Sequence, residues 1–514
     1  MSATHMILPP MAITFNELAM AGSIVFVLYY ITSAVYYIYF HPMSKFPGPK
    51  TTAFSRLPLV SATVSGQTWQ YLEKLHAQYG PIVRIAPDEI TTTRSGAWKD
   101  IYTSKPILPK DPFSQTPPMN GADSLFTAAG QTHVRMRRTM VNAFSDRALK
   151  EQSSLIESYA DLLLTRLRRE VGKSPAGEVD MAKYYGYAML DIIADLTFGE
   201  SFHGLEDDNE HSWILQFFLG AKFGSIRNSL SRWHPIDKIF GWIFLKLTAK
   251  HRAKNWAVAT NAITQRLEMG DLGNVRSDFI TPVVGRVDES MEKGITRKEL
   301  NTNGLALVIA GCQLPTVALA ASTYLMMRYP HTLKELTHEI RTSFESEKEI
   351  TIVSTQNLPY LSAVINETLR IHHPTPINLP RITVPEGQVI DGDFIPGNNV
   401  IGVNLQNIQN SPENWVEPRV FHPERFLPES DPRFDSRFLK DDKQAFLPFS
   451  IGTRNCMGGK VFLAEARLIL SKMVWNFEME LVDKDDWNWL DQKAYLVFEP
   501  KDLFVKLREK SVSL

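Results

Sequence analysis

The feature that most constrains this chain is a short segment around its second cysteine. The segment runs from Phe449 to Gly458 and reads F-S-I-G-T-R-N-C-M-G, which fits the pattern F-x-x-G-x-R-x-C-x-G. With ordinary residue usage, five fixed residue types at this spacing arise by chance on the order of once in 10⁴ chains of this length. Each fixed residue has a physical task if the sulfur of Cys456 binds a haem iron. The alternative is a structural cysteine in a glycine-rich loop, which is the usual interpretation of an isolated cysteine.

In the haem interpretation, Cys456 supplies a thiolate, which adds electron density to the iron and favours cleavage of an O–O bond. Gly452 and Gly458 carry no side chain and let the backbone approach a flat macrocycle. Arg454 can pair with a haem propionate, and Phe449 can shield the sulfur from water. The residues after Cys456 have a helical pattern, so we expect the sulfur near a helix N-terminus, where partial positive charge favours the thiolate.

The composition is that of an ordinary globular protein and excludes several classes. The 514 residues are 44% hydrophobic and 22% charged, which does not indicate disorder. The net charge of −1 gives no argument for a nucleic-acid partner. Cys312 and Cys456 are the only cysteines. If Cys456 is a metal ligand, no intramolecular disulfide is possible, which suits a reducing compartment.

The N-terminal region contains a run from Leu18 to Phe40 without a charged residue, long enough to cross a bilayer as a helix. A signal peptide normally has a basic start, but no Lys or Arg precedes Leu18. A buried core helix is the other alternative, and the terminal position and aromatic-rich end argue against it. Lys45 and Lys50 follow the run, so the positive-inside rule places the bulk of the chain in the cytosol. We predict a short non-cytosolic N-terminus over 1–17 and a transmembrane anchor over 18–40.

After the anchor, the sequence predicts one mainly helical domain with a minor β region. Two prolines around Gly48 indicate a stiff elbow, so we assign 41–50 to a Pro/Gly hinge and 51–514 to the catalytic domain. Short strand-like runs occur at 82–85, 89–93 and 496–507. A long apolar helix is expected over 306–328, interrupted by Pro315.

A second motif lies at Glu367-Thr368-Leu369-Arg370, an E-x-x-R. On a helix the carboxylate of Glu367 and the guanidinium of Arg370 share a face and can meet. Arg425, in a downstream P-E-R-F, can join them as a third charge in a buried network. Most such pairs are solvated surface pairs, so this motif is weak by itself. The adjacent His372 and His373 show no metal-ligand spacing and are expected to be structural.

Taken together, the cysteine segment, the E-x-x-R, the P-E-R-F and the anchor with its elbow resemble the cytochrome P-450 superfamily of haem-thiolate monooxygenases. The order and spacing of these motifs match along the whole chain, and the sequence is similar to those of membrane-bound fungal members. The resemblance implies a large single fold with haem b bound through Cys456. It also implies that His133 and Arg137, in an H-x-x-x-R, and Arg381, in Leu-Pro-Arg, meet the haem propionates. For His133 and Arg137 the alternative is a basic, solvated helix face.

The sequence departs from this family in the long apolar helix. Gln313 and Leu314 stand where the family has an acid and a threonine that deliver protons to bound dioxygen, and leucine cannot relay a proton. Three explanations stay open: Thr316 orders the water instead, a substrate group supplies the proton, or the enzyme rearranges or dehydrates its substrate without activating dioxygen. A non-catalytic haem-binding or scaffold protein is a further reading. Cys312 is expected to be a small buried residue.

For substrate and partners, the aromatic and basic stretch over 213–247 predicts a roof above the substrate cavity that rests on the membrane. By resemblance, the pocket candidates are 119–126, Ala310, Gly311, Leu314, Ile377 and Asn378. An apolar substrate such as a terpenoid or polyketide suits such a lining. No G-x-G-x-x-G fingerprint occurs, so electrons are expected from a separate NADPH-dependent flavoprotein reductase in the endoplasmic reticulum membrane. Rearrangement or dehydration would need no reductase.

Overall fold

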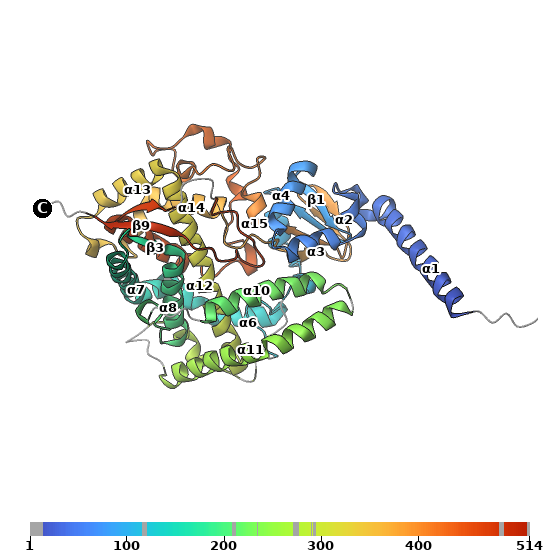
Figure 1. Ribbon diagram of the computed structural model, residues 1–514, viewed down its shortest axis with the longest axis horizontal. Coiled ribbons are helices and arrows are strands. Elements are labelled where there is room, and N and C mark those ends of the chain that lie inside the picture. Colours follow the sequence, from blue (N-terminus) through green and yellow to red (C-terminus); the bar gives the residue numbers. More distant parts are fainter. Residues whose placement is uncertain are drawn as a thin grey trace, which may run out of the picture.

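The computed structural model describes residues 14–115, 121–207, 212–233, 235–270, 277–288, 290, 294–482 and 488–510. It is mainly helical with a minor β region (Figure 1), which confirms the predicted fold class. The helices are α1 Phe15–Val35, α2 Lys50–Phe54, α3 Leu57–Val64, α4 Thr68–Tyr79, α5 Ala97–Tyr102, α6 Gly130–Met140, α7 Asp146–Lys173, α8 Met181–Phe198, α9 Gly204–Asp207, α10 Ser212–Leu230, α11 Ile236–Glu268, α12 Arg297–Arg328, α13 Pro330–Ser343, α14 Pro359–Ile371, α15 Leu405–Ile408 and α16 Gly459–Asn476. The strands are β1 Ile82–Ala86, β2 Glu89–Thr92, β3 Glu178–Asp180, β4 Arg381–Ile382, β5 Gln388–Ile390, β6 Asp393–Ile395, β7 Val400–Val403, β8 Phe477–Leu481 and β9 Phe504–Glu509.

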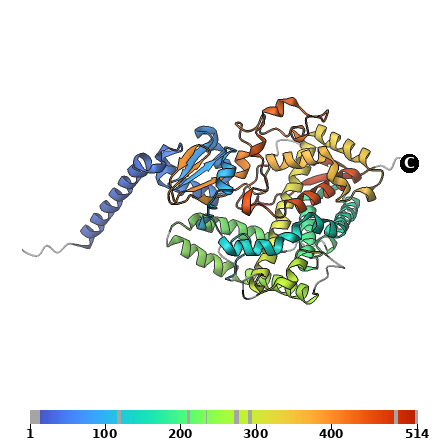
Figure 2. The same ribbon diagram turned by 180° about the vertical axis from the view of Figure 1, so that it is seen from behind.

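Helix α1 projects away from the globular part of the molecule (Figures 1 and 2). It starts earlier than the predicted anchor, because Thr14 and Glu17 form a capping box in which each accepts the other's backbone N–H. The helix continues into a π-helical turn, Tyr36–Phe40, and no residue of either element is buried. The combined helix is long and apolar enough to cross a membrane. The predicted segment 1–17 lies outside the described residues up to residue 13.

The four-stranded sheet brings distant parts of the chain together in the order β1-β2-β7-β4. β1 pairs with β2 and β4 with β7 in antiparallel fashion, whereas β2 and β7 run parallel. Every residue of β2 and β7 is buried. The sheet therefore fixes β4, the strand that carries Arg381, against the N-terminal part of the chain.

The predicted hinge packs against this sheet. Met43 and Phe46 are buried in the hydrophobic cluster of the sheet. The N–H of Arg84 in β1 donates to Pro47 O at 2.8 Å. A Cβ on Gly48 would lie 2.5 Å from the carbonyl oxygen of Arg84, so only glycine allows the elbow to approach the strand this closely. The elbow thus joins α1 to the globular part through a packed contact.

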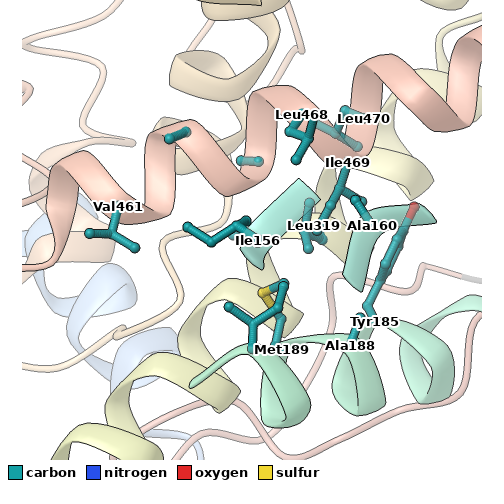
Figure 3. Packing of buried hydrophobic residues seen from close by; sticks show 14 of the residues in the cluster. Ile156, Ala160, Tyr185, Ala188, Met189, Leu319, Val461, Leu468, Ile469 and Leu470 are labelled. Carbon is teal, nitrogen blue, oxygen red and sulfur yellow. The ribbon is translucent and has the colours of Figure 1, made fainter. Parts of the chain in front are cut away.

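The main hydrophobic core lies between α7, α8, α12 and α16. Figure 3 shows Ile156 of α7, Met189 of α8, Leu319 of α12 and Leu468 of α16 pointing toward one another, and all four are fully buried. Nearly every residue of α8 is buried, because α8 is covered by α7 on one side and by α12 on the other. This core holds the helix that contains Gln313 and the helix that follows Cys456 in one rigid unit.

Helix α12 runs from Arg297 to Arg328 with Pro315 inside it. Proline has no N–H, so the carbonyl of Gly311 loses its helical donor. The helix continues because the residues from Val317 to Met327 are buried in the core and stabilise it. α12 also begins earlier than predicted, since Thr296 and Glu299 form a capping box.

The predicted strand over 496–507 is only partly regular. Ladder pairing begins at Phe504, where β9 pairs with β3 and β8. Before it, Glu499 N–H turns back to Lys493 O, and Pro500 has no N–H to donate to a ladder. The apolar run therefore divides between a bent, buried segment and a short strand.

Candidate active site

Cys456 lies at the end of a tight loop that folds back on itself. Its N–H donates to the carbonyl of Phe449 at 2.9 Å, and Gly452–Arg454 form a 3-10 turn within the loop. Gly452 has a φ of +79°, and a Cβ there would lie 2.2 Å from the carbonyl oxygen of Tyr102. Both the left-handed backbone and the close approach to α5 require glycine at this position.

The sulfur of Cys456 lies at the N-terminal end of α16. The side chain is exposed, yet protein atoms surround it closely enough that partial desolvation raises the pKa of the thiol. The backbone N–H groups of Gly458 and Gly459 and the charge of Arg137 oppose this rise. The sulfur therefore lies where a helix N-terminus favours its thiolate form, as the sequence led us to expect.

Phe449 packs against the start of α16, where the two glycines after Cys456 lie. The Phe449 ring lies next to Gly459, where a Cβ would come within 3.0 Å of the ring. A Cβ on Gly458, in contrast, would meet no protein atom within 4 Å. Gly459 is thus needed for packing against Phe449, whereas Gly458 leaves open space beside the sulfur.

Basic side chains from four segments converge beside the cysteine loop. Arg137 of α6 donates to the carbonyl and side-chain oxygens of Asn455 at 2.9 and 2.5 Å. Arg381 of β4 lies over the Tyr102 ring at 5.0 Å. Burial, together with the charges of Arg454, Arg137 and a lysine, lowers the pKa of His133 to about 4, so this imidazole is neutral at pH 7. The structure thus brings together His133, Arg137, Arg381 and Arg454, which the sequence proposed as one group.

The lysine of this cluster is Lys110, which the sequence analysis missed. It pairs with Arg381 in a β-bridge, and its Nζ donates to Phe126 O at 2.7 Å. Burial and the charges of Arg454 and Arg381 lower the pKa of Lys110 to about 7. Lys110 lies in no periodic pattern, so only the fold shows its position.

The cation cluster has no acidic partner among the described residues. None of Lys110, His133, Arg137, Arg381 and Arg454 forms an ion pair with a carboxylate in the described part of the chain, and the Nη1 atom of Arg454 is buried without a hydrogen-bond partner. Arg381 is buried, and Lys110, Arg137 and Arg454 are half-buried. Removing cations from water in this way is unfavourable unless they are paired. The cluster is therefore suited to an anionic ligand with more than one negative group.

The E-x-x-R residues form a buried ionic network behind the cysteine loop. Arg370 contacts both carboxylate oxygens of Glu367 at 2.7 Å, and Arg425 contacts Glu367 at 3.1 Å. Arg425 also pairs with Asp441 at 2.5 Å, and all four side chains are fully buried. Asp441, which the sequence analysis missed, gives the network two acids for its two arginines. The network ties α14 to the segment that leads into the cysteine loop.

On α12, the predicted catalytic residues occupy different faces. Thr316 donates its hydroxyl to Cys312 O at 2.7 Å, and the Cys312 thiol approaches Gly186 O of α8 at 3.7 Å. Thr316 therefore lies on the side of α12 that faces α8. Leu314, two residues earlier, is rotated about 200° from Thr316 around a helix of 3.6 residues per turn. Burial raises the pKa of Cys312 to about 12, so it is not a reactive thiol.

Ala306, Ile309, Gly311 and Thr316 of α12 are half-exposed, and Leu307, Ala310 and Leu314 form a half-exposed stripe along the same helix. The spacing of three and four residues places the three members of the stripe on one face. The Gln313 side chain is buried next to this stripe and makes no hydrogen bond to any described residue. Gly311 packs against α8, because a Cβ there would lie 2.4 Å from Ile193. The absence of a side chain at Gly311 thus serves helix packing.

The remaining pocket candidates lie on the segment before Arg381. Ile377 and Asn378 are half-buried and pair with the chain at Asn404 and Leu405. The Asn378 amide, in the orientation that satisfies its neighbours, donates to the carbonyls of Gly402 and Val403 at 3.2 and 3.3 Å. Of the segment 119–126, positions 119 and 120 lie outside the described residues. Leu125 N–H donates to the Asn303 side chain of α12 at 2.8 Å, so this segment is fixed to α12.

A cysteine at a helix N-terminus beside unpaired cations, in a mainly helical fold with a buried E-x-x-R network, defines the class of haem-thiolate proteins. The chain belongs to the cytochrome P450 family, whose profile matches residues 47–507. It is 34% identical to the cytochrome P450 monooxygenase lcsI of Purpureocillium lilacinum over 96% of both chains. It is 35% identical to an averantin hydroxylase of Dothistroma septosporum, over 96% of this chain and 91% of the relative. The protein is therefore a P450 monooxygenase, an oxidoreductase, as the resemblance predicted.

The family implies a haem held by a cysteine thiolate, and the residues present fit this group. The buried Arg454 Nη1 and the four other basic groups offer partners for two propionates. The open space beside Gly458 leaves room next to the sulfur for a flat ring system. The Phe449 ring packs over Gly459, close to the same position.

Proposed function

We propose that this protein is a membrane-anchored monooxygenase of fungal secondary metabolism that uses NADPH and dioxygen to oxidise an apolar small molecule of terpenoid or polyketide type. The observation that carries the proposal is the position of Cys456 at the N-terminus of α16, beside a cation cluster without acidic partners. The haem, when bound, supplies the iron that activates dioxygen. One relative is named for the hydroxylation of averantin, which supports hydroxylation as the type of oxidation.

In this proposal the chain's own residues hold the cofactor and shape the substrate side. Arg137, Arg381, Arg454 and Lys110 pair with the propionates, and neutral His133 donates one hydrogen bond. The N–H groups of Gly458 and Gly459 stabilise the negative charge on the sulfur. The stripe of Leu307, Ala310 and Leu314 provides an apolar wall, which suits an apolar substrate.

Proton delivery in this protein differs from the usual acid and threonine pair. The hydroxyl hydrogen of Thr316 is engaged by Cys312 O, and its side of α12 faces α8. These contacts favour two sources of the proton, the substrate itself or a water held by the Gln313 amide. They disfavour a relay through Thr316. Gln313 can orient water through its amide but does not titrate.

The membrane side of the proposal involves α1 and α11. Along the first half of α11, apolar side chains are exposed, including Ile236, Ile239, Trp242 and Leu247. Lys246 lies over the Trp242 ring at 5.0 Å, as is common in helices at a bilayer surface. We infer a single-pass anchor in the endoplasmic reticulum with the catalytic domain in the cytosol, next to a flavoprotein reductase. Protease added to sealed microsomes should digest 51–514 without detergent, and protection of this part would contradict the topology.

The two cysteines provide the test of the haem assignment. Cys456→Ala should abolish the thiolate-type spectrum of the reduced protein with carbon monoxide. Cys312→Ala, the matched control inside α12, should retain it. A thiolate-type spectrum in Cys456→Ala would reject Cys456 as the ligand.

A second candidate function, reductant-free rearrangement or dehydration in the same fold, is favoured by Gln313 and Leu314 in place of the acid and threonine. The two functions differ in their need for NADPH and dioxygen. Microsomes with and without reductase, supplied with candidate substrates under isotopically labelled dioxygen, separate them. Label in a product that forms only with NADPH supports the monooxygenase, and an unlabelled product formed without NADPH supports the second function.

A further inference from the structure

Two adjacent histidines at the end of α14, His372 and His373, are both buried but have different surroundings. The His372 ring stacks on Phe498 with centroids 3.9 Å apart, and its Nε2 has no hydrogen-bond partner among the described residues. The His373 ring, in contrast, is hydrogen-bonded at both nitrogens. The two residues are adjacent in the chain and both are buried. A difference between matched variants at the two positions therefore reports on the hydrogen bonds of the His373 ring.

The contacts of His373 place the hydrogen on Nε2. Nε2 lies 3.0 Å from Pro448 O, and a carbonyl only accepts, so Nε2 carries the hydrogen. Nδ1 lies 3.1 Å from both the N–H and the carbonyl oxygen of Thr375, and in the neutral ring it accepts that N–H. Burial lowers the pKa of His373, which agrees with a neutral ring. The backbone N–H of His373 also donates to Gln406 of α15 at 2.8 Å, so both the backbone and the ring are fixed.

Pro448 is the residue at which the cysteine loop begins. Phe449, the next residue, accepts the N–H of Cys456 at 2.9 Å. The hydrogen bond from His373 thus reaches the residue next to Phe449, whose carbonyl accepts the N–H of Cys456. It connects the end of the E-x-x-R helix, three residues after Arg370, directly to the loop that presents the sulfur.

We propose that His373 is a positioning residue that holds the cysteine loop through its Nε2–H···O=C bond to Pro448. The proposal rests on Cys456 being the iron ligand. Without this bond the start of the loop is held less firmly, and the sulfur departs more easily from the position in which its thiolate is a ligand. Loss of one buried hydrogen bond should lower the ratio of thiolate-type to non-thiolate protein about tenfold.

Two amide substitutions test the bond with little change in polarity. The amide nitrogen of His373→Gln can reach the position of Nε2 and donate to Pro448 O, whereas that of His373→Asn reaches only the position of Nδ1. Reduced, haem-loaded protein with carbon monoxide should keep the wild-type proportion of the thiolate-type spectrum in His373→Gln and lose it in His373→Asn. His372→Asn, the matched control, should behave like wild type.

A second readout does not depend on activity or on the spectrum. Backbone hydrogen exchange over 447–458 should be faster in His373→Asn than in His373→Gln, and unchanged in His372→Asn. Equal spectra and equal exchange in the two His373 variants would overturn the proposal, as would an equal loss in His372→Asn. If wild-type protein itself lacks the thiolate-type spectrum, the haem assignment fails instead, so the two failures are distinguishable.

Discussion

Arg425 lies 2.5 Å from Asp441, and neither side chain has any exposed surface. Asp441→Asn removes the negative charge and leaves Glu367, at the longer distance of 3.1 Å, as the acidic partner of Arg425. Breaking a buried ion pair from one side costs about 3–5 kcal/mol. We expect a large drop in thermal stability and in the yield of haem-loaded protein. Asp435→Asn, which removes a half-exposed partner of Arg437, should change neither, and equal effects of the two variants would show that Asp441 is not a structural charge.

Lys110→Met removes one cation from the cluster beside the cysteine loop. If the cluster holds propionates, haem should leave the variant several times faster, because one charge-assisted contact is lost. Lys110→Arg keeps the charge and should retain haem nearly as well. The measurement is the rate of haem transfer to a scavenging apoprotein, with the exposed Lys150→Met as control. An unchanged rate in Lys110→Met would remove this lysine from the cofactor site.

Glu465 gives the protein a pH-dependent stability. Burial in α16 raises the pKa of its carboxyl from its ordinary value of 4.5 to about 8. Between these values the folded state keeps a proton that the unfolded state has released, so stability falls as pH rises, by at most about 1.4 kcal/mol per pH unit. Above about pH 8 both states are ionised and this contribution becomes constant. In Glu465→Gln the decrease in thermal stability from pH 5.5 to 8 should be smaller than in wild type, whereas the exposed Glu345→Gln should show the wild-type decrease.

Gly311→Ala tests the packing of α12 on α8. The new methyl would lie 2.4 Å from the Ile193 side chain, so the helices must shift, at a cost of about 1–3 kcal/mol. Thermal unfolding should show this loss, and Ile193→Ala in the same chain should recover part of it by making room. Full stability of Gly311→Ala alone would contradict the contact.

Leu314→Thr restores the hydroxyl that the family normally has at this position. Because a hydroxyl can relay a proton and leucine cannot, we expect product formed per NADPH consumed to change more than substrate affinity. Leu307→Thr, on the same stripe two turns earlier, should leave this coupling, the product formed per NADPH consumed, unchanged. If neither substitution alters the coupling, Leu314 is not part of proton delivery.

Some of the residues that sequence reasoning found have a local signal, whereas Arg381 and the pair His133 and Arg137 came from the family resemblance. Glu367 and Arg370 are one helical turn apart, and the cysteine segment is contiguous, so spacing alone indicates contact. Lys110 and Asp441 have no such relation to their partners, because β4 and the segment after Arg425 approach them only in the folded chain. Neither follows a periodic pattern that a sequence could reveal.

Physical causes also explain where the predicted bounds of the helices differ from the structure. The start of α12 and the start of α1 were missed, since capping boxes extend a helix beyond its apolar run. The helix continues past Pro315 because core packing outweighs a single lost hydrogen bond. The contact of Gly311 with Ile193 was missed, because Ile193 lies on a helix far away in the sequence.

The parallel pairing of β2 with β7 has a consequence for biogenesis. Glu89 pairs with Val400, which the ribosome adds roughly three hundred residues later. At about 5–20 residues per second, tens of seconds separate the synthesis of the two strands. During that time α1 can already be inserted in the bilayer while β2 still lacks its parallel neighbour. Completion of this sheet is therefore a late event, and under the proposed topology it is carried out by a chain that is already tethered at the membrane surface.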